Sequence, residues 1–529
     1  MPWIYFFRQE KNPPRDKKSE YVMRKPMITA GEHKPFCSFR PSSGNVFCDF
    51  PALKETTLNR PTIFAFFPFL FCVAVAAPAQ TDDASTRKLA QDIFKQLIEI
   101  NTTDSVGSVT AASEAMAQRF RDAGFPDSDI QIVGPNDRKK NVVVRLHGSG
   151  KHKPVLLIGH LDVVEAKRED WTTDPFKFVE QEGFFYGRGT TDMKDGDAIM
   201  SATLIRMKKE GYAPSRDIIL TMTADEEGGT SNGVDWLLKN HRELIDAEFV
   251  INHDGGGVLV DHGKPTFMDV NATEKLYGDF VLTATNPGGH SSLPKPENAI
   301  YQLSAALLKV AQYQFPFELN NITRAYYERM VATGQRAADI KAILKNPPDM
   351  EAVARLSKDA MDNSLMHTTC VATRLNGGHA NNALPQSAQA NVNCRILPGH
   401  SLEETRQALE SAIADPKVKV QFRENNNKLM DRGSERHSYV PPPPRKEVFD
   451  PLEKVVAAMW PGIPVVPSMS TGASDGVYTN AAGIPTYCVS GVAFDRNDIR
   501  AHGKDERESV DGFHRGVDFY HRFLKGVTE

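Results

Sequence analysis

Histidine and acidic residues recur where predicted strands end, and their types and spacing suit the binding of a metal ion. His160 and Asp162 follow an apolar run at residues 154–159. In an extended chain, residues two apart point the same way, so both side chains are predicted to project together from the strand end. A histidine beside a carboxylate that orients its imidazole is a common arrangement for a metal ligand. A polar turn gives the same pattern, so this motif needs others beside it.

Two acidic motifs follow along the chain. Asp192 lies in a glycine-flanked loop before a predicted helix, where its carboxylate could also serve as the N-cap of that helix. Asp225, Glu226 and Glu227 come one residue after a predicted strand at residues 217–223. Three consecutive carboxylates at the end of a buried strand repel one another and are costly to desolvate. A solvated charge cluster is one explanation, but clustered cations would remove this cost directly.

Two histidine motifs complete the set. His253 and Asp254 follow a predicted strand at 248–252, and His502 lies near the C-terminus. Ligands of an open α/β sheet bind at the carboxyl ends of its strands, so the five motifs are predicted to meet at one sheet edge. Carboxylates and imidazoles without thiols suit zinc, manganese or cobalt in a hydrolytic site. Together, the motifs favour a metal site over five unrelated polar turns.

The elements that must position these motifs alternate between strands and helices. This alternation predicts the α/β class, with a mostly parallel sheet wrapped by helices. The strands are expected at 141–146, 154–159, 217–223 and 248–252, and the helices at 86–100, 111–123, 195–210 and 233–240.

A different pattern begins near residue 277 and predicts an inserted α+β domain. Its strands are expected at 278–285, 368–375 and 388–396, around helical stretches at 299–311 and 323–360. The first pattern then resumes, with helices at 403–414 and 450–460 and a strand at 418–422. We therefore predict four parts: a non-globular leader at 1–80, the first part of the α/β domain at 81–276, the inserted domain at 277–398, and the second part of the α/β domain at 399–529.

Length and charge limit the class of protein. The chain has 529 residues, with 63 Lys and Arg against 67 Asp and Glu, which gives a formal net charge of −4. This balance lacks the basic surface that DNA or RNA binding requires, so no nucleic-acid partner is expected. Hydrophobic residues make up 40% of the chain and charged residues 25%, which is ordinary for a soluble globular protein and excludes a disordered one.

The leader carries the features of a secretory signal peptide at about residues 60–79. Arg60 precedes an apolar run at 63–75, and small residues in an A-x-A spacing follow at 76–80. We expect a periplasmic or secreted protein, and a translation start near Leu58, because a signal core normally lies close to the start. An uncleaved membrane anchor is the alternative, although the run is short for a membrane span. Membrane contact is expected only in that case.

The cysteines predict no metal site of their own. Cys370, Cys394 and Cys488 would remain after removal of the leader, and they are widely spaced and odd in number. We therefore expect no disulfide framework, and at most one bridge among these three.

From about Thr86 to the C-terminus, the motifs in this order resemble the co-catalytic di-zinc peptidases related to carboxypeptidase S, glutamate carboxypeptidase and aminoacylase. The resemblance implies two Zn2+ ions per chain, with Co2+ or Mn2+ as alternatives, and a lid or dimerisation domain inserted in the catalytic domain. It also implies five metal ligands: His160 on one metal, Asp192 bridging both, Glu227 on the other, His502 completing the second site, and Asp254, with the adjacent His253 as the alternative to Asp254.

The same resemblance implies roles for two further acidic residues. Glu226 would act as general base and then as general acid, so its carboxylate cannot also be tied up as a ligand. Asp162 would orient His160. Two cations roughly 3.5–4 Å apart need a bridging carboxylate, which is the part expected of Asp192.

The inserted domain is implied to supply three more site residues. His290 lies in a loop that resembles the one sending a histidine into the active site, often that of a neighbouring subunit. Asn382 and Arg395 match the substrate-binding Asn and Arg of these peptidases in type and spacing. Arg395 could grip a terminal carboxylate through two hydrogen bonds. Without its neighbours, Arg395 would be interpreted as an ordinary surface residue of a strand.

The sequence thus predicts a periplasmic or secreted, zinc-dependent exopeptidase that hydrolyses the amide bond of dipeptides or C-terminal residues with metal-activated water. The alternative is an N-acyl-amino-acid amidohydrolase of the aminoacylase type, because the same metals serve both reactions. A non-catalytic peptide-binding protein is disfavoured, since Glu226 and a full ligand set are present. The expected partner is a small peptide or an N-acyl amino acid. A homodimer through the inserted domain stays open, because the helical stretch at 323–360 could cover the pairing face.

Overall fold

The structure is a computed structural model that describes residues 83–529, except residues 335, 425 and 434–438. The predicted leader and its signal peptide lie outside the described residues. Within the part of the chain that is described, no helix combines the length and the apolar character needed to cross a membrane.

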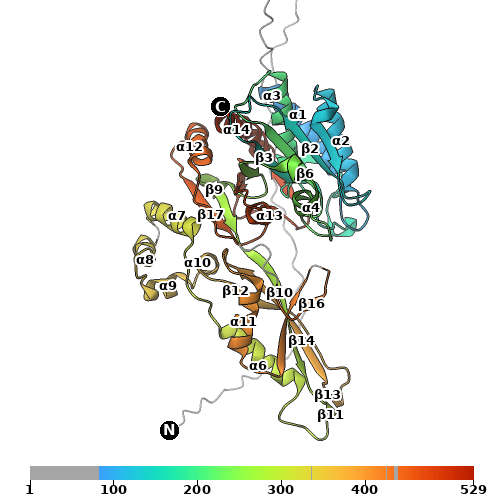
Figure 1. Ribbon diagram of the computed structural model, residues 1–529, viewed down its shortest axis with the longest axis vertical. Coiled ribbons are helices and arrows are strands. Elements are labelled where there is room, and N and C mark those ends of the chain that lie inside the picture. Colours follow the sequence, from blue (N-terminus) through green and yellow to red (C-terminus); the bar gives the residue numbers. More distant parts are fainter. Residues whose placement is uncertain (1–82, 335, 425, 434–438) are drawn as a thin grey trace, which may run out of the picture. The chain divides into compact units, whose positions relative to one another are not determined.

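A ten-stranded sheet carries the predicted metal motifs (Figure 1). Its order is β1-β2-β6-β3-β7-β18-β9-β8-β19, and β17 pairs with β9. The strands β6, β3, β7 and β18 are parallel to one another. In chain order the ten strands are β1 (Ile130–Val133), β2 (Asn141–Leu146), β3 (Val155–His160), β6 (Ile218–Thr223), β7 (Phe249–Asn252), β8 (Gly257–Asp261), β9 (Lys264–Glu274), β17 (Val465–Ser470), β18 (Thr486–Cys488) and β19 (Ala493–Asp495).

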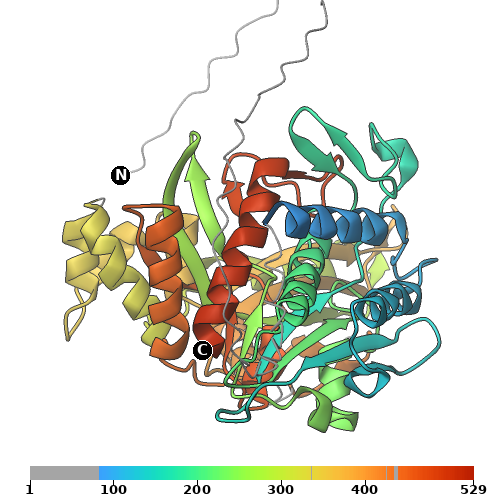
Figure 2. The same ribbon diagram turned by 90° about the horizontal axis from the view of Figure 1, so that it is seen from above.

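Helices cover both faces of this sheet, because the side chains of a buried strand point alternately to its two sides. In β3, Val155 and Leu157 join the core under one set of helices, whereas Leu156 and Ile158 join the other. The first set is α1 (Asp83–Glu99), α2 (Val109–Asp122), α3 (Lys194–Lys209), α12 (Lys446–Met459) and α14 (Val510–Thr528), and the second is α4 (Gly233–Asn240), α5 (Arg242–Ile245) and α13 (Gly476–Ala481). Figure 2 shows α1 (blue), α3 (green) and α14 (red) next to one another.

A five-stranded antiparallel sheet forms the inserted unit, in the order β12-β14-β10-β15-β16. Two helices pack on one face of this sheet. The elements are β10 (Leu276–Thr285), α6 (Ala299–Gln312), β12 (Thr369–Gly377), β14 (Ser387–Ile396), α11 (Leu402–Ile413), β15 (Val418–Arg423) and β16 (Leu429–Met430). The α/β sheet wrapped by helices, with an inserted α+β domain, confirms the predicted fold class.

The inserted unit extends beyond the predicted boundary at residue 398. β15 pairs with β10 over Asp279–Ala284, and α11 shares the core of the antiparallel sheet. Both elements therefore belong to the inserted unit and not to the second part of the α/β domain. The sequence shows a helix followed by a strand, but this order alone does not show which sheet the strand joins.

The helical stretch predicted at 323–360 is four short helices around their own small core. They are α7 (Asn321–Met330), α8 (Ala337–Ile343), α9 (Met350–Leu356) and α10 (Ala360–Met366). α7 packs against β17 (Figure 1). This insertion leaves β12 as an edge strand of the antiparallel sheet, with Val371 and Leu375 exposed.

A disulfide joins Cys370 of β12 to Cys394 of β14, which face each other in the strand register. Cys488 is a buried free thiol. This pairing agrees with the expectation of at most one bridge among the three cysteines.

Candidate metal centre

The predicted metal ligands follow three neighbouring parallel strands. His160 ends β3 and pairs with Thr223, which ends β6, while β7 ends at Asn252. Parallel strands that lie side by side carry their carboxyl ends at one edge of the sheet. The residues that follow these strands therefore come together at that edge.

Asp192 lies between two histidines from distant parts of the chain. Its Oδ1 is 3.1 Å from Nε2 of His160, and its Oδ2 is 3.0 Å from Nε2 of His502. Burial would raise the pKa of Asp192, but the hydrogen bonds and charges of both imidazoles together outweigh burial and lower it. Because each carboxylate oxygen faces a different imidazole, the geometry suits a carboxylate that bridges two cations.

Two groups of side chains have ligand atoms close enough to share a cation. One is His160, Asp192 and Glu227, and the other is His160, Glu226 and Asp254. Within each group the ligand atoms lie within 4.8 Å of one another. The structure therefore brings together the acidic residues that follow β6 and β7 with the histidine that ends β3.

His502 completes the cluster from the loop before the last helix. Its Nε2 lies 2.9 Å from Oε1 of Glu227, in addition to its contact with Asp192. The hydrogen bonds to Asp192 and Glu227 raise the pKa of His502 to about 10. Its backbone has a φ of 63°, a left-handed conformation that few residues other than glycine adopt.

The electrostatics of the cluster fit bound cations. Burial raises the pKa of Glu226 well above its usual range, and the charges of Asp254 and Asp475 add to this effect against the opposing charge of His160. Burial likewise raises the pKa of Asp254 to about 7. Buried carboxylates that repel one another are stabilised when cations neutralise them. Oxygen and imidazole donors without thiolates suit two divalent ions such as zinc, manganese or cobalt.

His253 points away from this cluster. It is buried, its ring lies 5.6 Å from that of Tyr520, and its Nε2 has no hydrogen-bond partner among the described residues. Gly196 of α3 is directly beside it, since a side chain at that position would touch the imidazole. Of the two alternatives left open by the sequence, the geometry places Asp254 with the other candidate ligands and His253 in the core.

Asp162 lies beside His160, but its carboxylate has a second task. The oxygen closest to Nδ1 of His160 is the backbone carbonyl of Asp162, at 3.0 Å, and the carboxylate is 3.8 Å away. The carboxylate accepts hydrogen bonds from the backbone N–H groups of Glu226 and Glu227, at 3.2 and 3.0 Å. Asp162 therefore fixes the loop that carries both glutamates as well as contacting the histidine.

A buried ion pair that the sequence analysis did not identify joins the two loops carrying Asp192 and His502. Nη1 of Arg188 donates to Oε2 of Glu506 at 2.6 Å, and Nη2 donates to the carbonyl of His502 at 3.3 Å. Glu506 also accepts the backbone N–H of Thr191 at 2.8 Å. Both partners stand within four residues of a motif residue, which is the signal that could have found them.

A second buried pair supports the glutamate loop. The ammonium of Lys139 contacts the carboxylate of Asp225, and both side chains are almost completely buried. Oδ2 of Asp225 also accepts the backbone N–H of Ser231, so the loop after β6 closes on this residue. Asp225 thus holds the loop and does not face the metal cluster.

The predicted site residues of the inserted unit fall into two places. The short strands β11 (Gly289–His290) and β13 (Ala383–Leu384) pair with each other, and Ser291 N–H donates to the carbonyl of Asn382 at 3.0 Å. This puts His290 and Asn382 side by side, beyond the Thr285 end of β10. Arg395 faces Tyr277 at the opposite end of β10. At about 3.4 Å per residue, the strand separates the two places by roughly 30 Å.

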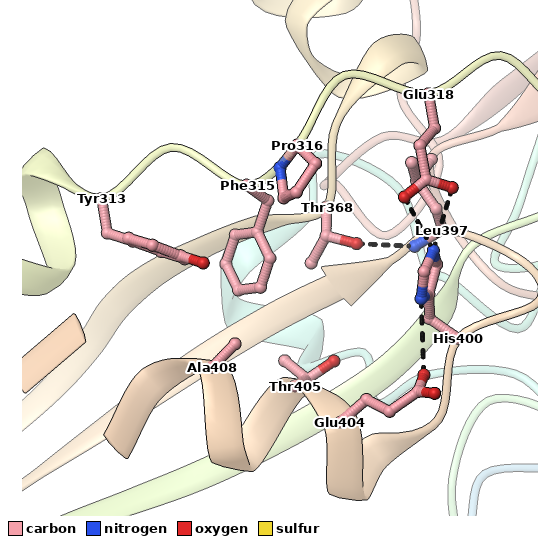
Figure 3. Close-up of a pocket in the computed structure, with 10 residues that line it drawn as sticks. All are labelled: Tyr313, Phe315, Pro316, Glu318, Thr368, Leu397, His400, Glu404, Thr405 and Ala408. Carbon is pink, nitrogen blue, oxygen red and sulfur yellow. Dashed lines mark hydrogen bonds and ion pairs between the residues drawn. The ribbon is translucent and has the colours of Figure 1, made fainter. Parts of the chain in front are cut away.

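A separate cavity of about 200 Å³ lies within the inserted unit (Figure 3). Tyr313 and Phe315 line one side, and His400 stands between two carboxylates on the other. Its Nε2 is 3.0 Å from Glu318 and its Nδ1 is 3.4 Å from Glu404. None of the predicted site residues lines this cavity, so it is distinct from the metal cluster.

Comparison with known proteins gives one consistent family. Residues 156–526 match the peptidase family M20/M25/M40. The human N-fatty-acyl-amino acid synthase/hydrolase PM20D1 is 26% identical over 386 residues, which cover 71% of this chain and 74% of that protein. The probable carboxypeptidase S-like 2 of Dictyostelium discoideum is 27% identical over 394 residues, which cover 71% of this chain and 72% of that protein.

Solved structures share the fold. The M20 family metallo-carboxypeptidase Sso-CP2 from Sulfolobus solfataricus aligns with a TM-score of 0.59 and 16% identity, over 83% of this chain and 99% of that one. The dipeptidase Dug1p from Saccharomyces cerevisiae aligns with a TM-score of 0.57 and 17% identity, over 84% and 97%. At these identities the similarity concerns the fold.

Proposed function

The chain belongs to the peptidase family M20/M25/M40, and from this membership we propose that it is a zinc-dependent exopeptidase acting on dipeptides or C-terminal residues. It is a metallo-hydrolase that acts on amide bonds, and its His, Asp and Glu cluster corresponds to a dinuclear metal site. The finer statement, that the substrate ends in a free carboxylate, rests on one side chain of the inserted unit.

That side chain is Arg395. It is partly buried, and its guanidinium has no hydrogen bond or ion pair with any described residue. A guanidinium offers five N–H donors in a planar fork that matches a carboxylate. A partly buried charge without a hydrogen-bonding or ion-pair partner is unfavourable by itself, so its retention supports the binding of an anionic group of the substrate. Dipeptides, and peptides cleaved at their C-terminal residue, carry such a group next to the scissile amide.

The proposed reaction needs one proton carrier. Bound at the sheet edge, two divalent cations would polarise the scissile carbonyl and lower the pKa of a water molecule. Oε2 of Glu226 lies 4.0 Å from Nε2 of His160, so its carboxylate borders the metal cluster, where the attacking water would be bound. Glu226 takes a proton from the attacking water and gives it to the leaving amine nitrogen.

Hydrolysis of N-acyl amino acids is the second candidate, because the human relative is an N-fatty-acyl-amino acid synthase/hydrolase. Both candidates require a free carboxylate on the amine side of the bond. They differ in the group on the carbonyl side, which is an amino acid in a dipeptide and an acyl chain in the alternative.

A substrate panel tests the proposal. Zinc-loaded protein should hydrolyse dipeptides, should lose activity on chelation, and should act poorly on the matching dipeptide amides. Faster hydrolysis of N-acyl amino acids than of dipeptides would favour the second candidate. Protein that retains its metal but hydrolyses neither class would support the non-catalytic, peptide-binding alternative.

We also propose that the active unit is a homodimer. His290 and Asn382 stand roughly 30 Å from Arg395 along the antiparallel sheet, so one substrate does not reach both places within one chain. A second copy could supply His290 and Asn382 from its own inserted unit. The edge strand β12 and the exposed Ile300, Tyr301 and Leu308 of α6 offer a surface for such pairing.

Export is proposed on the signal-peptide features, and the disulfide supports it, because disulfides persist mainly in oxidising compartments. N-terminal sequencing of the mature protein tests this step. We expect a start between Ala77 and Thr81. Soluble cytoplasmic protein that still begins at Met1 would contradict export.

A further inference from the structure

An aromatic ring, that of Tyr277, lies beneath the guanidinium of Arg395. Tyr277 faces Arg395 in the register of β10 and β14, and the guanidinium carbon lies 4.8 Å from the centre of the ring. This distance is within the range of a cation–π contact. The ring is the one partner of the guanidinium among the described side chains, and it is itself 47% exposed.

A hydrogen-bond network fixes this ring. The hydroxyl of Tyr277 donates to Oδ2 of Asp279 at 2.7 Å. Oδ1 of Asp279 accepts the side-chain amides of Asn391 at 2.8 Å and Asn393 at 3.0 Å. These residues alternate along β10 and β14 with the residues of the core, so they lie on the sheet face opposite α6 and α11.

The same network keeps the charge of Arg395 available. Asp279 is the carboxylate nearest in register to Arg395 on this face, yet no ion pair joins them. Three neutral donors occupy the oxygens of Asp279 instead. A guanidinium that lay free in water would lose rotamer freedom when it bound the substrate carboxylate. One that is stacked on a fixed ring has already lost part of this freedom, so binding costs it less entropy.

We propose that Tyr277 is the positioning residue of the carboxylate subsite: held by Asp279, it presents the guanidinium of Arg395 to the free carboxylate of the substrate. This inference rests on the proposed function, because it takes Arg395 as the carboxylate-binding group. Tyr277 acts through Arg395 and makes no contact with the reacting atoms. It therefore affects substrates with a free carboxylate and not their amides.

The test compares kcat and KM of zinc-loaded variants on a dipeptide and on the corresponding dipeptide amide. Tyr277→Leu should raise KM for the dipeptide by roughly 3- to 30-fold, which is the range of a partly desolvated cation–π contact, and leave kcat nearly unchanged. Tyr277→Phe keeps the ring but loses its tether, so its KM should lie between those of Tyr277→Leu and the parent. Tyr313→Leu, at a partly exposed tyrosine of the separate cavity, is the control and should behave like the parent.

Arg395→Ala distinguishes a failure of the carboxylate role of Arg395 from a failure of the positioning role of Tyr277. If it leaves KM for the dipeptide unchanged, the proposed carboxylate role of Arg395 fails and the inference fails with it. If it raises KM while Tyr277→Leu and Tyr277→Phe do not, only the inference is overturned. An equal rise in KM for dipeptide and amide would show that Tyr277 has a general structural role. Addition of Tyr277→Leu to Arg395→Ala should produce no further rise.

Discussion

The three consecutive acidic residues after β6 take two different directions. Asp225 has a φ of 60° and turns its carboxylate inward to Lys139. Glu226 and Glu227 point the other way, toward His160 and His502. A left-handed residue reverses the local direction of the chain, so the first acid anchors the loop while the next two face the cluster. The ion pair of Asp225 with Lys139 thus gives this carboxylate a structural role and leaves Glu226 and Glu227 at the cluster.

The sequence predicted metal chemistry at these positions because clustered acids at a buried strand end are costly without cations. It did not indicate that Asp225 turns inward, since Lys139 stands far away in the chain and pairs with it only after folding. In the same way, Asp162 was predicted to orient His160, but its hydrogen bonds to the glutamate loop depend on the register of β3 and β6.

Exchange of each glutamate for glutamine separates the proton carrier from the ligand. Glu226→Gln should retain its zinc while kcat falls by at least ~10²-fold, because an amide cannot accept the proton of water. Glu227→Gln should lose zinc, since it removes a carboxylate that contacts His502. Metal content and kcat are measured together, with Glu243→Gln on the exposed surface as the control. Loss of zinc from Glu226→Gln and not from Glu227→Gln would reverse the two roles.

At the scale of elements, the cluster depends on loops that are joined by buried pairs. Arg188 and Glu506 connect the loop after β5 (Phe184–Tyr186) to the loop before β20 (Arg507–Ser509), and these two strands also pair. Both carboxylate oxygens of Glu506 accept hydrogen bonds from residues of the loop that carries Asp192. The two ligand loops are therefore fixed to each other by a buried ion pair and its hydrogen bonds.

Glu506→Gln should weaken zinc binding without removing a ligand. The amide replaces a charge that balances the buried Arg188, which is 3% exposed, so both loops lose their fixed position. We expect a loss of roughly 10- to 100-fold in zinc affinity, the range found for supporting groups of metal sites. Competition with a chromophoric chelator measures it, and Glu453→Gln, in an exposed ion pair, is the control. Unchanged zinc affinity in folded Glu506→Gln would rule out this supporting role.

The junction between the two sheets carries a buried lysine. Lys275 stands between β9 and β10, and its backbone N–H donates to Ser470 of β17. Its ammonium donates to the carbonyl of His367, at the C-terminal end of α10, at 2.7 Å, and to Ser364 at 3.1 Å. A cation at a helix C-terminus is favourable, but these oxygens are neutral and the side chain is fully buried. Lys275 therefore ties the helical insertion to the junction at an electrostatic cost.

This cost predicts a pH dependence of stability. Burial lowers the pKa of Lys275 to about 7, and the charge of Arg395 adds to the shift. Between pH 7 and the ordinary lysine pKa, the unfolded chain binds a proton that the folded chain does not, so the contribution of Lys275 to stability rises with pH. Compared with the parent, Lys275→Met should be relatively most stable at pH 6 and lose this advantage toward pH 9.

Thermal unfolding of the parent and of Lys275→Met across this pH range measures the difference. Lys264→Met, at an exposed lysine at the start of β9, should run parallel to the parent at every pH. A difference between parent and Lys275→Met that is constant with pH would contradict a neutral Lys275 above pH 7.

At the scale of the whole molecule, the sequence predicted the α/β domain with an inserted unit because the strands and helices alternate with clear periods. The sequence-based boundary placed the end of that unit too early. α11 and β15 have the same helix-then-strand order as the α/β domain, so they were assigned to it. Pairing of β15 with β10 is a long-range contact between Asp279 and Arg423 and their neighbours. The separation of His290 from Arg395 follows from the length of β10. The spacing of motifs along the sequence could not predict it.

That separation leads to the prediction of a shared active site. If His290 of the partner subunit donates a hydrogen bond to the developing oxyanion, the interaction strengthens in the transition state, so His290→Ala should lower kcat by something like 10²–10³-fold. Its metal content should stay at the parent level, because His290 is not among the clustered ligands. Ser292→Ala removes the hydroxyl that holds Nδ1 of His290 at 2.7 Å and should give a smaller loss.

Mixing two inactive variants then tests the origin of the histidine. A His290→Ala chain keeps its Glu226, and a Glu226→Gln chain keeps its His290, so a hybrid dimer contains one site with both groups. Co-refolded or co-expressed chains should therefore recover activity, up to about a quarter of the parent value if chains pair at random and each intact site works independently. A fully active monomer, or mixtures that stay inactive although hybrids form, would mean that each inserted unit serves its own metal cluster. Full activity of His290→Ala alone would remove the histidine from the mechanism altogether.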